Sequence, residues 1–381
     1  MLNRLKPKSE FSRNVLTLMT GTTIAQAIPI TISPILTRIY TPEDFGVFAL
    51  FIAITSIFGS IANGRYELAI MLPKKNEDAI NIFALGFIIT FVISLLLLVL
   101  VITFNDYFTK LLNNDEISIW LYFVPVGVFF TGLWNILNYF NNRKKQYRDL
   151  ANAIIIKSIV TAIVQLSIGF IKSGVTGLIS GQILSQLFSN TKLFLNIVND
   201  KVLISKISKL KIIALSKRYK DFPKFTLWAG LSNTLSENLT NILISSFYSV
   251  STLGFYSLVQ KVLGIPASLI GGAIGQVFFQ QATNEKQETG TAINSFKNTF
   301  YKLLILGIVF FPLLYLTITD IFVIVFGTSW AIAGEYAKIL FPLLLIKFIV
   351  SPLTVINQIY MKNRNAMFWQ FGLLVISISI L

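Results

Sequence analysis

Long apolar stretches separated by short polar segments dominate the chain. A membrane-spanning helix needs about 20 predominantly apolar residues, and the chain holds ten stretches of this kind and an eleventh that is shorter. The predicted spans are residues 15–38, 46–72, 79–103, 117–140, 151–171, 175–198, 225–248, 252–279, 299–318, 338–360 and 367–381. The pattern therefore predicts an all-α membrane protein that crosses the bilayer many times. The last stretch is too short to cross, so we expect a C-terminal truncation and a missing twelfth span.

Cations are distributed unevenly between the segments that connect these spans. If the N-terminus lies in the cytoplasm, the cytoplasmic segments carry 23 Lys and Arg residues and the opposite segments carry four. Cytoplasmic loops are enriched in Lys and Arg, and one misplaced span would have mixed the two classes. The sequence therefore predicts a cytoplasmic N-terminus. A cleaved signal peptide is not expected, because the first apolar stretch continues to Ile39, longer than the core of such a peptide.

Composition narrows the functional classes. Only 13% of the residues are charged, against about 25% in soluble domains. The chain has no Cys and no His, which excludes disulfides, Cys–His or Ser–His catalysis and His-ligated metals. In a soluble protein, the net charge of +15 would indicate binding of nucleic acid. Here the excess of Lys and Arg in the cytoplasmic segments accounts for it. We therefore expect no nucleic-acid partner.

One basic segment divides the chain. Residues Asp200–Lys224 alternate cationic and apolar residues, which favours an amphipathic helix on the anionic leaflet over a plain solvated linker. We predict an N-terminal six-helix lobe (1–198), this linker (199–224) and an incomplete C-terminal lobe (225–381). Residues 45–50 (FGVFAL) and 253–258 (LGFYSL) each open the second span of a lobe, which indicates a parallel repeat. Prolines such as Pro34, Pro125 and Pro312 are expected to kink the spans.

Six of the charged residues inside the predicted spans are candidates for function: Arg65, Glu67, Lys157, Glu237, Lys261 and Lys347. Each charge costs roughly 2.5–3.5 kcal/mol at mid-depth, so each is a functional candidate. Arg65, Glu67 and Lys157 lie within reach of the cytoplasmic interface, where cations can snorkel. Glu237 lies about 18 Å deep at 1.5 Å per residue, and Lys261 and Lys347 are nearly as deep, so we expect these three to face protein or water.

Two interpretations of these charges stay open. One is a structural ion pair between Glu237 and Lys261, and the other, which we favour, is a wet central cavity. Four cations and two anions would make such a cavity net positive, which favours a substrate that carries phosphate. The cations Arg65, Lys261, Lys347 and Lys157 are then candidates for substrate binding. The carboxylates Glu237 and Glu67 are candidates for binding a coupling ion.

Several ordered motifs resemble one family. They are residues 65–70 (RYELAI) followed by Leu72-Pro73, Phe222-Pro223, residues 254–258 (GFYSL) running on to 266–271 and 276–279, residues 326–330 (FGTSW) with 333–337 (AGEYA), and Ser351-Pro352-Leu353. Together they resemble the bacterial polysaccharide repeat-unit flippases, the Wzx-like O-antigen and lipid-linked oligosaccharide exporters of the MOP superfamily, which also includes MATE exporters. Arg65 matches a family motif, whereas Lys261 and Lys347 fit by position only.

The resemblance implies a function as well as a fold. It implies a two-lobe helical bundle of twelve helices in the bacterial cytoplasmic (inner) membrane, with alternating access between the lobes. The implied substrate is an undecaprenyl-diphosphate-linked oligosaccharide, exported at the expense of an H⁺ or Na⁺ gradient. Other polysaccharide assembly proteins are expected partners, beside the lipid bilayer. The chain departs from the family in length, which puts a complete C-terminal lobe in doubt.

Two other functions remain as alternatives. A MATE-type multidrug exporter would share the fold but needs a cavity suited to cationic drugs, which the excess of cations disfavours. A membrane-embedded polysaccharide polymerase or ligase needs an exterior catalytic loop, and the predicted exterior segments are short. The sequence shows no Gly-rich phosphate loop and no paired carboxylates on a loop. We therefore expect neither an enzyme nor a cofactor or metal site.

Overall fold

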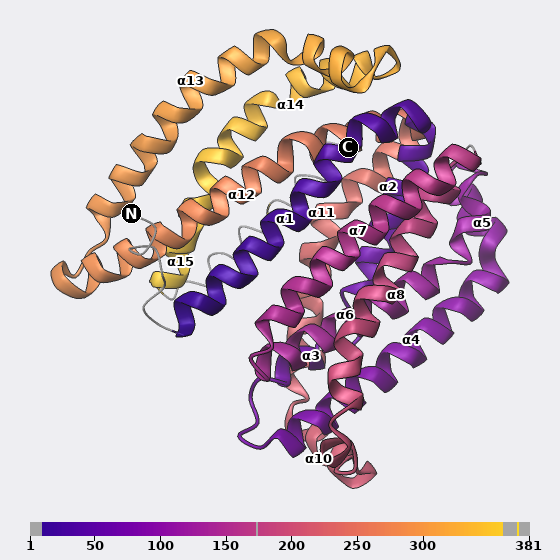
Figure 1. Ribbon diagram of the computed structural model, residues 1–381, viewed down its shortest axis with the longest axis vertical. Helices are drawn as coiled ribbons and strands as arrows, with labels where there is room; N and C mark the ends of the chain where they lie inside the picture. Colours follow the sequence, from indigo (N-terminus) through magenta and orange to yellow (C-terminus); the bar gives the residue numbers. More distant parts are fainter. Residues whose placement is uncertain (1–9, 173, 361–371, 373–381) are drawn as a thin grey trace. The chain divides into compact units, whose positions relative to one another are not determined.

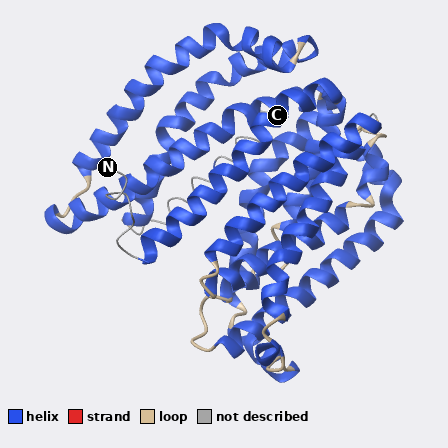
Figure 2. Cartoon of the chain, viewed as in Figure 1, coloured by secondary structure: helices blue, strands red, loops and turns tan. Residues whose placement is uncertain are grey.

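The computed structural model of the protein describes residues 10–172, 174–360 and 372. Every regular element in these ranges is a helix, as predicted (Figure 2). By contact, the chain divides into two compact units, and Figure 1 labels their helices. The chain enters the second unit at Ser33, returns to the first at Val47 and enters the second again at Ser251.

The helices of the first unit come mainly from the N-terminal half of the chain. They are α1 (Glu10–Ile39) up to Ile32, α2 (Pro42–Gly59) from Val47, α3 (Tyr66–Ala69), α4 (Asn76–Leu111), α5 (Ile117–Leu121), α6 (Val124–Arg143), α7 (Tyr147–Ile171), α8 (Thr176–Val198), α9 (Lys201–Ile204), α10 (Lys209–Arg218), the π-helical turn η2 (Phe222–Thr226) and α11 (Leu227–Phe247). Residues 225–250 thus lie in this unit by contact, whereas the sequence predicts that the C-terminal lobe begins at residue 225. That division into lobes stays a prediction.

The second unit contains the remaining described elements. They are Ser33–Gly46, α12 (Val250–Thr289) from Ser251, α13 (Ile293–Phe326), the 3-10 turn η3 (Thr328–Trp330), α14 (Ala331–Val350), the 3-10 turn η4 (Ser351–Val355) and α15 (Ile356–Ile359). α13 and α14 pack against each other along this unit (Figure 1).

Helix α4 shows how these helices suit a lipid environment. Its buried face carries polar side chains, among them Thr90 and Ser94, whereas Leu96 and Ile102 on the opposite face are 62% and 61% exposed. A soluble protein places its apolar residues inside and its polar residues outside. This reversed arrangement suits a helix that hydrocarbon surrounds, because its polar groups then face protein, as where the Thr90 hydroxyl accepts from the Asn63 amide at 2.7 Å.

Five helical segments among the described residues are long and apolar enough to cross a membrane: Pro42–Gly59, Asn76–Leu111, Ile117–Arg143, Tyr147–Ile171 and Thr328–Val355. α13 makes a sixth if its two halves, which are bent by 41°, form one span. The bend lies next to Pro312, whose ring removes a helix hydrogen bond. The eleven spans stay a prediction, and the last of them lies outside the described residues except for residue 372.

The prolines do not all kink helices. Pro125 and Pro352 lie in the first turns of α6 and η4, where the missing N–H has no helical partner to lose. The predicted span over 117–140 is interrupted at Tyr122 and Phe123, and Pro125 lies in the first turn of the helix that follows. A kink of the span at Pro125 stays a prediction. Pro312 and Pro342 do lie inside α13 and α14.

The basic linker is helical and is anchored to the first unit. Asn81 of α4 donates to the Lys206 carbonyl at 3.0 Å and accepts from the Ser208 N–H at 2.8 Å. Lys211 of α10 pairs with Glu77 of α4 at 3.0 Å. The linker therefore has a docked face, while other apolar residues of it, such as Leu210 at 80%, remain exposed. Contact of this exposed face with the anionic leaflet stays a prediction.

Replacing Asn81 with alanine is expected to release the linker. The substitution leaves the Ser208 N–H and the Lys206 carbonyl without this partner, which costs about 1–3 kcal/mol for buried groups. Trypsin should then cut the lysine-rich linker of the purified protein in detergent micelles at least tenfold faster. Asn152→Ala changes the same residue type at an exposed position of α7 and should leave the cleavage rate unchanged. Equal rates for Asn81→Ala and the unmodified protein would contradict the anchoring.

Trp330 forms the centre of a tight cluster in the second unit. This side chain is fully buried, and its Nε1–H donates to the Thr37 carbonyl at 2.9 Å. The rings of Phe45 and Phe255 meet it edge to face, with centroids 4.9 and 5.8 Å away. The cluster ties the junction between α1 and α2 to the start of α12 and to η3.

The two segments predicted as repeats approach each other closely in this unit. A methyl group on Gly254 of α12 would lie 3.2 Å from the backbone nitrogen of Gly46 and would overlap the Pro42 carbonyl. The Ser251 hydroxyl also donates to the Glu43 carboxylate. Backbone therefore packs directly on backbone where α2 and α12 begin. The parallel repeat of whole lobes stays a prediction.

Candidate functional site

The chain interrupts its helix between α2 and α3, where the sequence predicts one continuous span over residues 46–72. α2 ends at Gly59, and turns lead to Gly64 and Arg65, which both have left-handed backbone angles (φ 58° and 63°). Glycine adopts this conformation freely, whereas a residue with a side chain pays about 1–2 kcal/mol. The expectation of a continuous helix is wrong here, because it followed hydrophobicity alone, which does not report such a turn.

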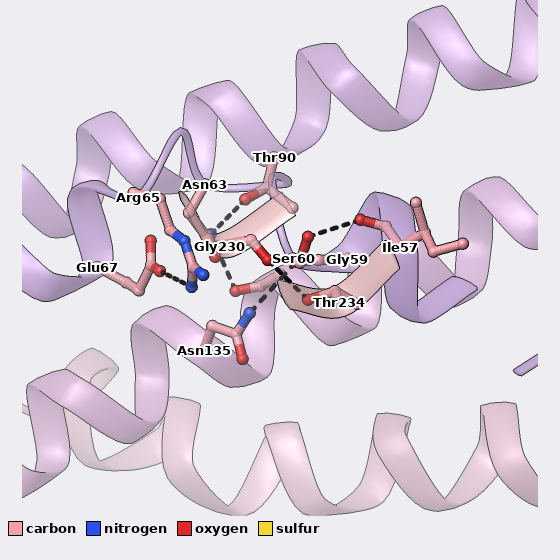
Figure 3. A network of polar contacts seen from close by, with 11 residues as sticks. Ile57, Gly59, Ser60, Asn63, Arg65, Glu67, Thr90, Asn135, Gly230 and Thr234 are labelled. Carbon is pink, nitrogen blue, oxygen red and sulfur yellow. Dashed lines mark hydrogen bonds and ion pairs between the residues drawn. The ribbon is translucent and has the colours of Figure 1, made fainter. Parts of the chain in front are cut away.

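Asn63 holds this turn in place. Its side-chain amide donates to the Thr90 hydroxyl at 2.7 Å (Figure 3) and to the Gly132 carbonyl at 3.0 Å. Asn63 is 2% exposed, so these bonds form away from solvent. They tie the turn to α4 and α6 and fix the residue that precedes Gly64 and Arg65.

Arg65 and Glu67 form an ion pair at the end of the turn. The Arg65 Nη1 lies 3.5 Å from the Glu67 Oε1, and the two side chains are 23% and 3% exposed (Figure 3). In the part of the chain that the structure describes, the Arg65 Nε and the Glu67 Oε2 are buried without a hydrogen-bond partner. The pair is therefore long and satisfies only part of the bonding capacity of either group.

Gly230 of α11 forms one wall of this pair. Figure 3 shows the Arg65 guanidinium lying against Gly230, and any side chain at this position would overlap that group. The Thr234 hydroxyl donates to the Gly230 carbonyl at 3.0 Å. Because Gly230 has no side chain, the planar guanidinium of Arg65 can occupy the space beside its backbone.

Helix α6 contributes two polar side chains on the same side of the turn. The Asn135 amide donates to the Gly59 carbonyl at 3.4 Å (Figure 3). The Tyr139 hydroxyl interacts electrostatically with both Arg65 and Glu67. We call the group formed by Asn63, Arg65, Glu67, Tyr139 and Gly230 the turn cluster.

The other predicted residues of the first unit lie apart from the turn cluster in sequence and in their contacts. Lys157 of α7 is partly buried, with its ammonium 5.9 Å from the centre of the Trp134 ring, a distance typical of cation–π contacts. Glu237 of α11 is exposed and accepts a bond from the Asn233 amide at 3.2 Å. The structure thus brings Arg65 and Glu67 together and gives Lys157 and Glu237 other partners.

The polar side chains of α11 bond to their own helix. Thr234, Ser236 and Asn238 each donate to the carbonyl four residues earlier, at 2.9–3.0 Å. These bonds satisfy one donor of each side chain and leave acceptor lone pairs. The helix can therefore present hydroxyl and amide groups without relying on another helix for them.

The remaining two cations belong to the second unit. Lys261 of α12 is partly buried, and Lys347 in the last turn of α14 is exposed. A shared cavity for these two with Arg65 stays a prediction. Pairing of Glu237 with Lys261 stays untested in the same way.

Sequence reasoning missed three members of the turn cluster. Gly230 and Asn63 carry no charge, and Tyr139 looks like any aromatic residue of an apolar span. The Asn-Gly pair at residues 63–64 was the available signal, because this dipeptide is typical of turns. Nothing in the sequence places Gly230 beside Arg65, since 164 positions lie between them.

Comparison with known proteins identifies the family. A family model described as polysaccharide biosynthesis protein matches residues 35–335, which is most of the chain. A search of curated protein sequences gave no match.

Solved structures share the fold at low sequence identity. A multidrug resistance MATE family transporter of the MOP superfamily, in an inward-facing conformation, has a TM-score of 0.65 and 12% identity, over 94% of this chain and 83% of that one. The MATE multidrug transporter DinF-BH has a TM-score of 0.62 and 14% identity, over 96% and 86%. A MOP superfamily transporter from Pyrococcus furiosus has a TM-score of 0.55 and 12% identity, over 94% and 84%. The chain therefore belongs to the polysaccharide biosynthesis protein family, and it is a membrane protein with the fold of MOP superfamily transporters.

Proposed function

We propose that the protein moves an undecaprenyl-diphosphate-linked oligosaccharide across the bacterial cytoplasmic membrane by alternating access. The observation that carries the proposal is the Arg65 guanidinium, which is mostly buried and has an unpartnered Nε among the described residues. Guanidinium groups bind phosphate through several N–H donors at once, more strongly than neutral donors do. A diphosphate head group therefore matches the bonding capacity of the guanidinium, of which Glu67 uses only a small part.

The other charged residues have roles in the same proposal. Lys261, Lys347 and Lys157 add positive charge along the path of the head group, while the sugars occupy the wet interior and the lipid tail stays in the bilayer. Glu237 and Glu67 are the carboxylates that bind the coupling ion, H⁺ or Na⁺. The net charge of these six groups favours an anionic substrate over the cationic drugs of a multidrug exporter.

The MATE-type alternative has one observation in its favour, which is the fold shared with multidrug transporters. The Pyrococcus furiosus relative is described as having a binding pocket of reverse polarity that suggests a different function. This fold therefore accommodates pockets of different charge, and the charged residues of each chain must decide between substrates.

The test is a deletion strain complemented with variants. Without the gene, lipid-linked oligosaccharide should accumulate on the inner membrane face and surface polysaccharide should be lost. Arg65→Ala should restore at least tenfold less polysaccharide than the unmodified gene, because a charged hydrogen bond contributes about 1.5–3 kcal/mol. Arg148→Ala removes the same side chain from an exposed position of α7 and should restore polysaccharide fully.

Three results would overturn the proposal. Normal polysaccharide in the deletion strain excludes the flippase role, and increased drug susceptibility beside it indicates a multidrug exporter. Single repeat units on the surface indicate loss of a polymerase instead. Full restoration by Arg65→Ala, at equal protein levels in the membrane, removes Arg65 from the transport path.

A further inference from the structure

Glu67 is held in a position where it can only partly neutralise Arg65. Its side chain is 3% exposed, one oxygen lies 3.5 Å from the guanidinium, and the other is buried without a partner among the described residues. A strong charged pair is usually closer, at about 2.7–2.9 Å. The carboxylate therefore lies beside the Nη1 atom of Arg65, but at a distance where the ion pair is weaker than a close one.

Few other charged groups face Glu67. α3 packs against α4, α6 and η2. From α6 the Tyr139 hydroxyl interacts with it, whereas the guanidinium of Arg143 donates to the Ile70 and Met71 carbonyls, both at 3.2 Å. On α4 the carboxylate of Glu77 is paired with Lys211, and on η2 the ammonium of Lys224 lies over the Phe225 ring. Arg65 is thus the cation on which the charge of Glu67 depends.

Removing that cation has a predictable consequence. A buried carboxylate that loses its only counter-ion is strongly destabilised, and it becomes neutral by taking up a proton. The guanidinium lies directly against the Gly230 backbone, and Glu67 occupies its Nη1 side at 3.5 Å, so an anion that takes the Nη1 donor competes with Glu67 for it. An anion that engages Arg65 fully must therefore displace Glu67.

We infer that Glu67 occupies Arg65 as an internal anion while the site is empty, and that a substrate diphosphate displaces it with uptake of one proton by Glu67. The inference rests on the proposed function, because it requires an anionic head group at Arg65. It assigns Glu67 as a positioning residue for the binding step. The displaced carboxylate takes its proton from solvent. When the head group leaves, Glu67 loses this proton and pairs with Arg65 again. This proton accompanies the head group, so of the two candidate carboxylates Glu237 is the one that binds the ion whose gradient drives export.

A proton suits this position better than Na⁺. Neutralising a carboxylate takes a single proton on one oxygen, whereas hard metal cations require several oxygen ligands. The described residues contain no group of three or more acidic side chains that could hold a metal ion. The neighbouring guanidinium would also repel a bound cation.

The experiment measures binding of inorganic pyrophosphate to the purified full chain in detergent micelles. Calorimetric titrations in two buffers of different ionisation enthalpy give the number of protons taken up. Protons exchanged by pyrophosphate itself are the same in both titrations, so the difference between the two proteins reports Glu67. The unmodified protein should take up about one proton more than Glu67→Gln. Binding of pyrophosphate to the unmodified protein should weaken relative to Glu67→Gln as the pH rises, because only the unmodified protein must take up a proton. The ratio of the two affinities should change by up to about tenfold per pH unit, which is the limit for one linked proton.

Controls separate this inference from the proposed function. Glu116→Gln alters an exposed loop carboxylate and should match the unmodified protein. If Glu67→Gln fails to fold, Glu67→Asp withdraws the carboxylate by one methylene and should bind pyrophosphate more tightly while still taking up the proton. Binding that is lost in Arg65→Ala but involves no proton at Glu67, or that depends on Na⁺ instead, overturns the inference alone. No binding at any pH overturns the inference and the proposed function together.

Discussion

Replacing Gly254 with alanine is expected to prevent the second unit from folding. The added methyl group would overlap the Pro42 carbonyl and lie 2.7 Å from the Pro42 carbonyl carbon. Both groups belong to backbone, so no change of rotamer relieves the overlap, and α12 must move away from the start of α2. Overpacking costs about 1–3 kcal/mol even where flexible side chains can adjust, and a backbone clash exceeds that range. The same movement pulls Phe255 away from Trp330.

The measurement is the amount of protein that remains in the membrane and its elution profile after extraction in mild detergent. Gly254→Ala should reduce the monodisperse fraction at least tenfold. Gly264→Ala is the matched control, because it lies on the same helix and, among the described residues, its methyl group would meet only the Gln260 Oε1, at 3.8 Å. That control should equal or slightly exceed the unmodified protein, since alanine favours helix over glycine by about 1 kcal/mol. A monodisperse Gly254→Ala would contradict the close packing of α2 and α12.

Replacing Trp330 with alanine is expected to have the second-largest effect on stability. The indole is fully buried between Phe45 and Phe255, and its N–H satisfies the Thr37 carbonyl. Removing a buried aromatic side chain of this size costs about 3–5 kcal/mol, because the cavity left behind closes only in part. The junction between α1 and α2 should therefore separate from η3 well before the rest of the unit unfolds.

Thermal unfolding of the purified protein, followed by loss of monodispersity, measures this effect. Trp330→Phe keeps most of the ring contacts but loses the hydrogen bond, so its loss of stability should be about 1–3 kcal/mol. Trp228→Ala removes an indole that is 63% exposed and should shift the transition far less. An unfolding temperature of Trp330→Ala equal to that of Trp228→Ala would show that the cluster does not stabilise the unit.

The sequence predicts the helices of this protein better than it predicts their interruptions. The all-α architecture follows from apolar stretches and from the sparse charge, and the comparisons confirm the family resemblance. The break at Gly64 and Arg65 does not follow, because it depends on two left-handed residues whose cost is offset by the bonds of Asn63 to α4 and α6. Hydrophobicity measures a tendency averaged over many residues, whereas such a turn is decided by a few hydrogen bonds.

The candidate site was predictable only where charge marks it. Arg65 and Glu67 stand out because ionised groups are rare in apolar spans, and the structure places them together. Gly230 was not predictable, because its importance lies in the absence of a side chain beside a guanidinium from another helix. Lys347 carries the same kind of signal as Arg65, yet it is exposed in the structure. Charge in a span therefore identifies candidates, and packing decides what surrounds each of them.

Helix α1 continues without interruption from the first unit into the second, changing units between Ile32 and Ser33. The same run of helical hydrogen bonds therefore belongs to both units. Prolines lack the amide hydrogen of a helix, and Pro29 and Pro34 lie on either side of the boundary, so bending of α1 is expected to concentrate there. These two residues, which carry no charge and lie outside the turn cluster, are therefore the positions where substitution should change the flexibility of α1 most.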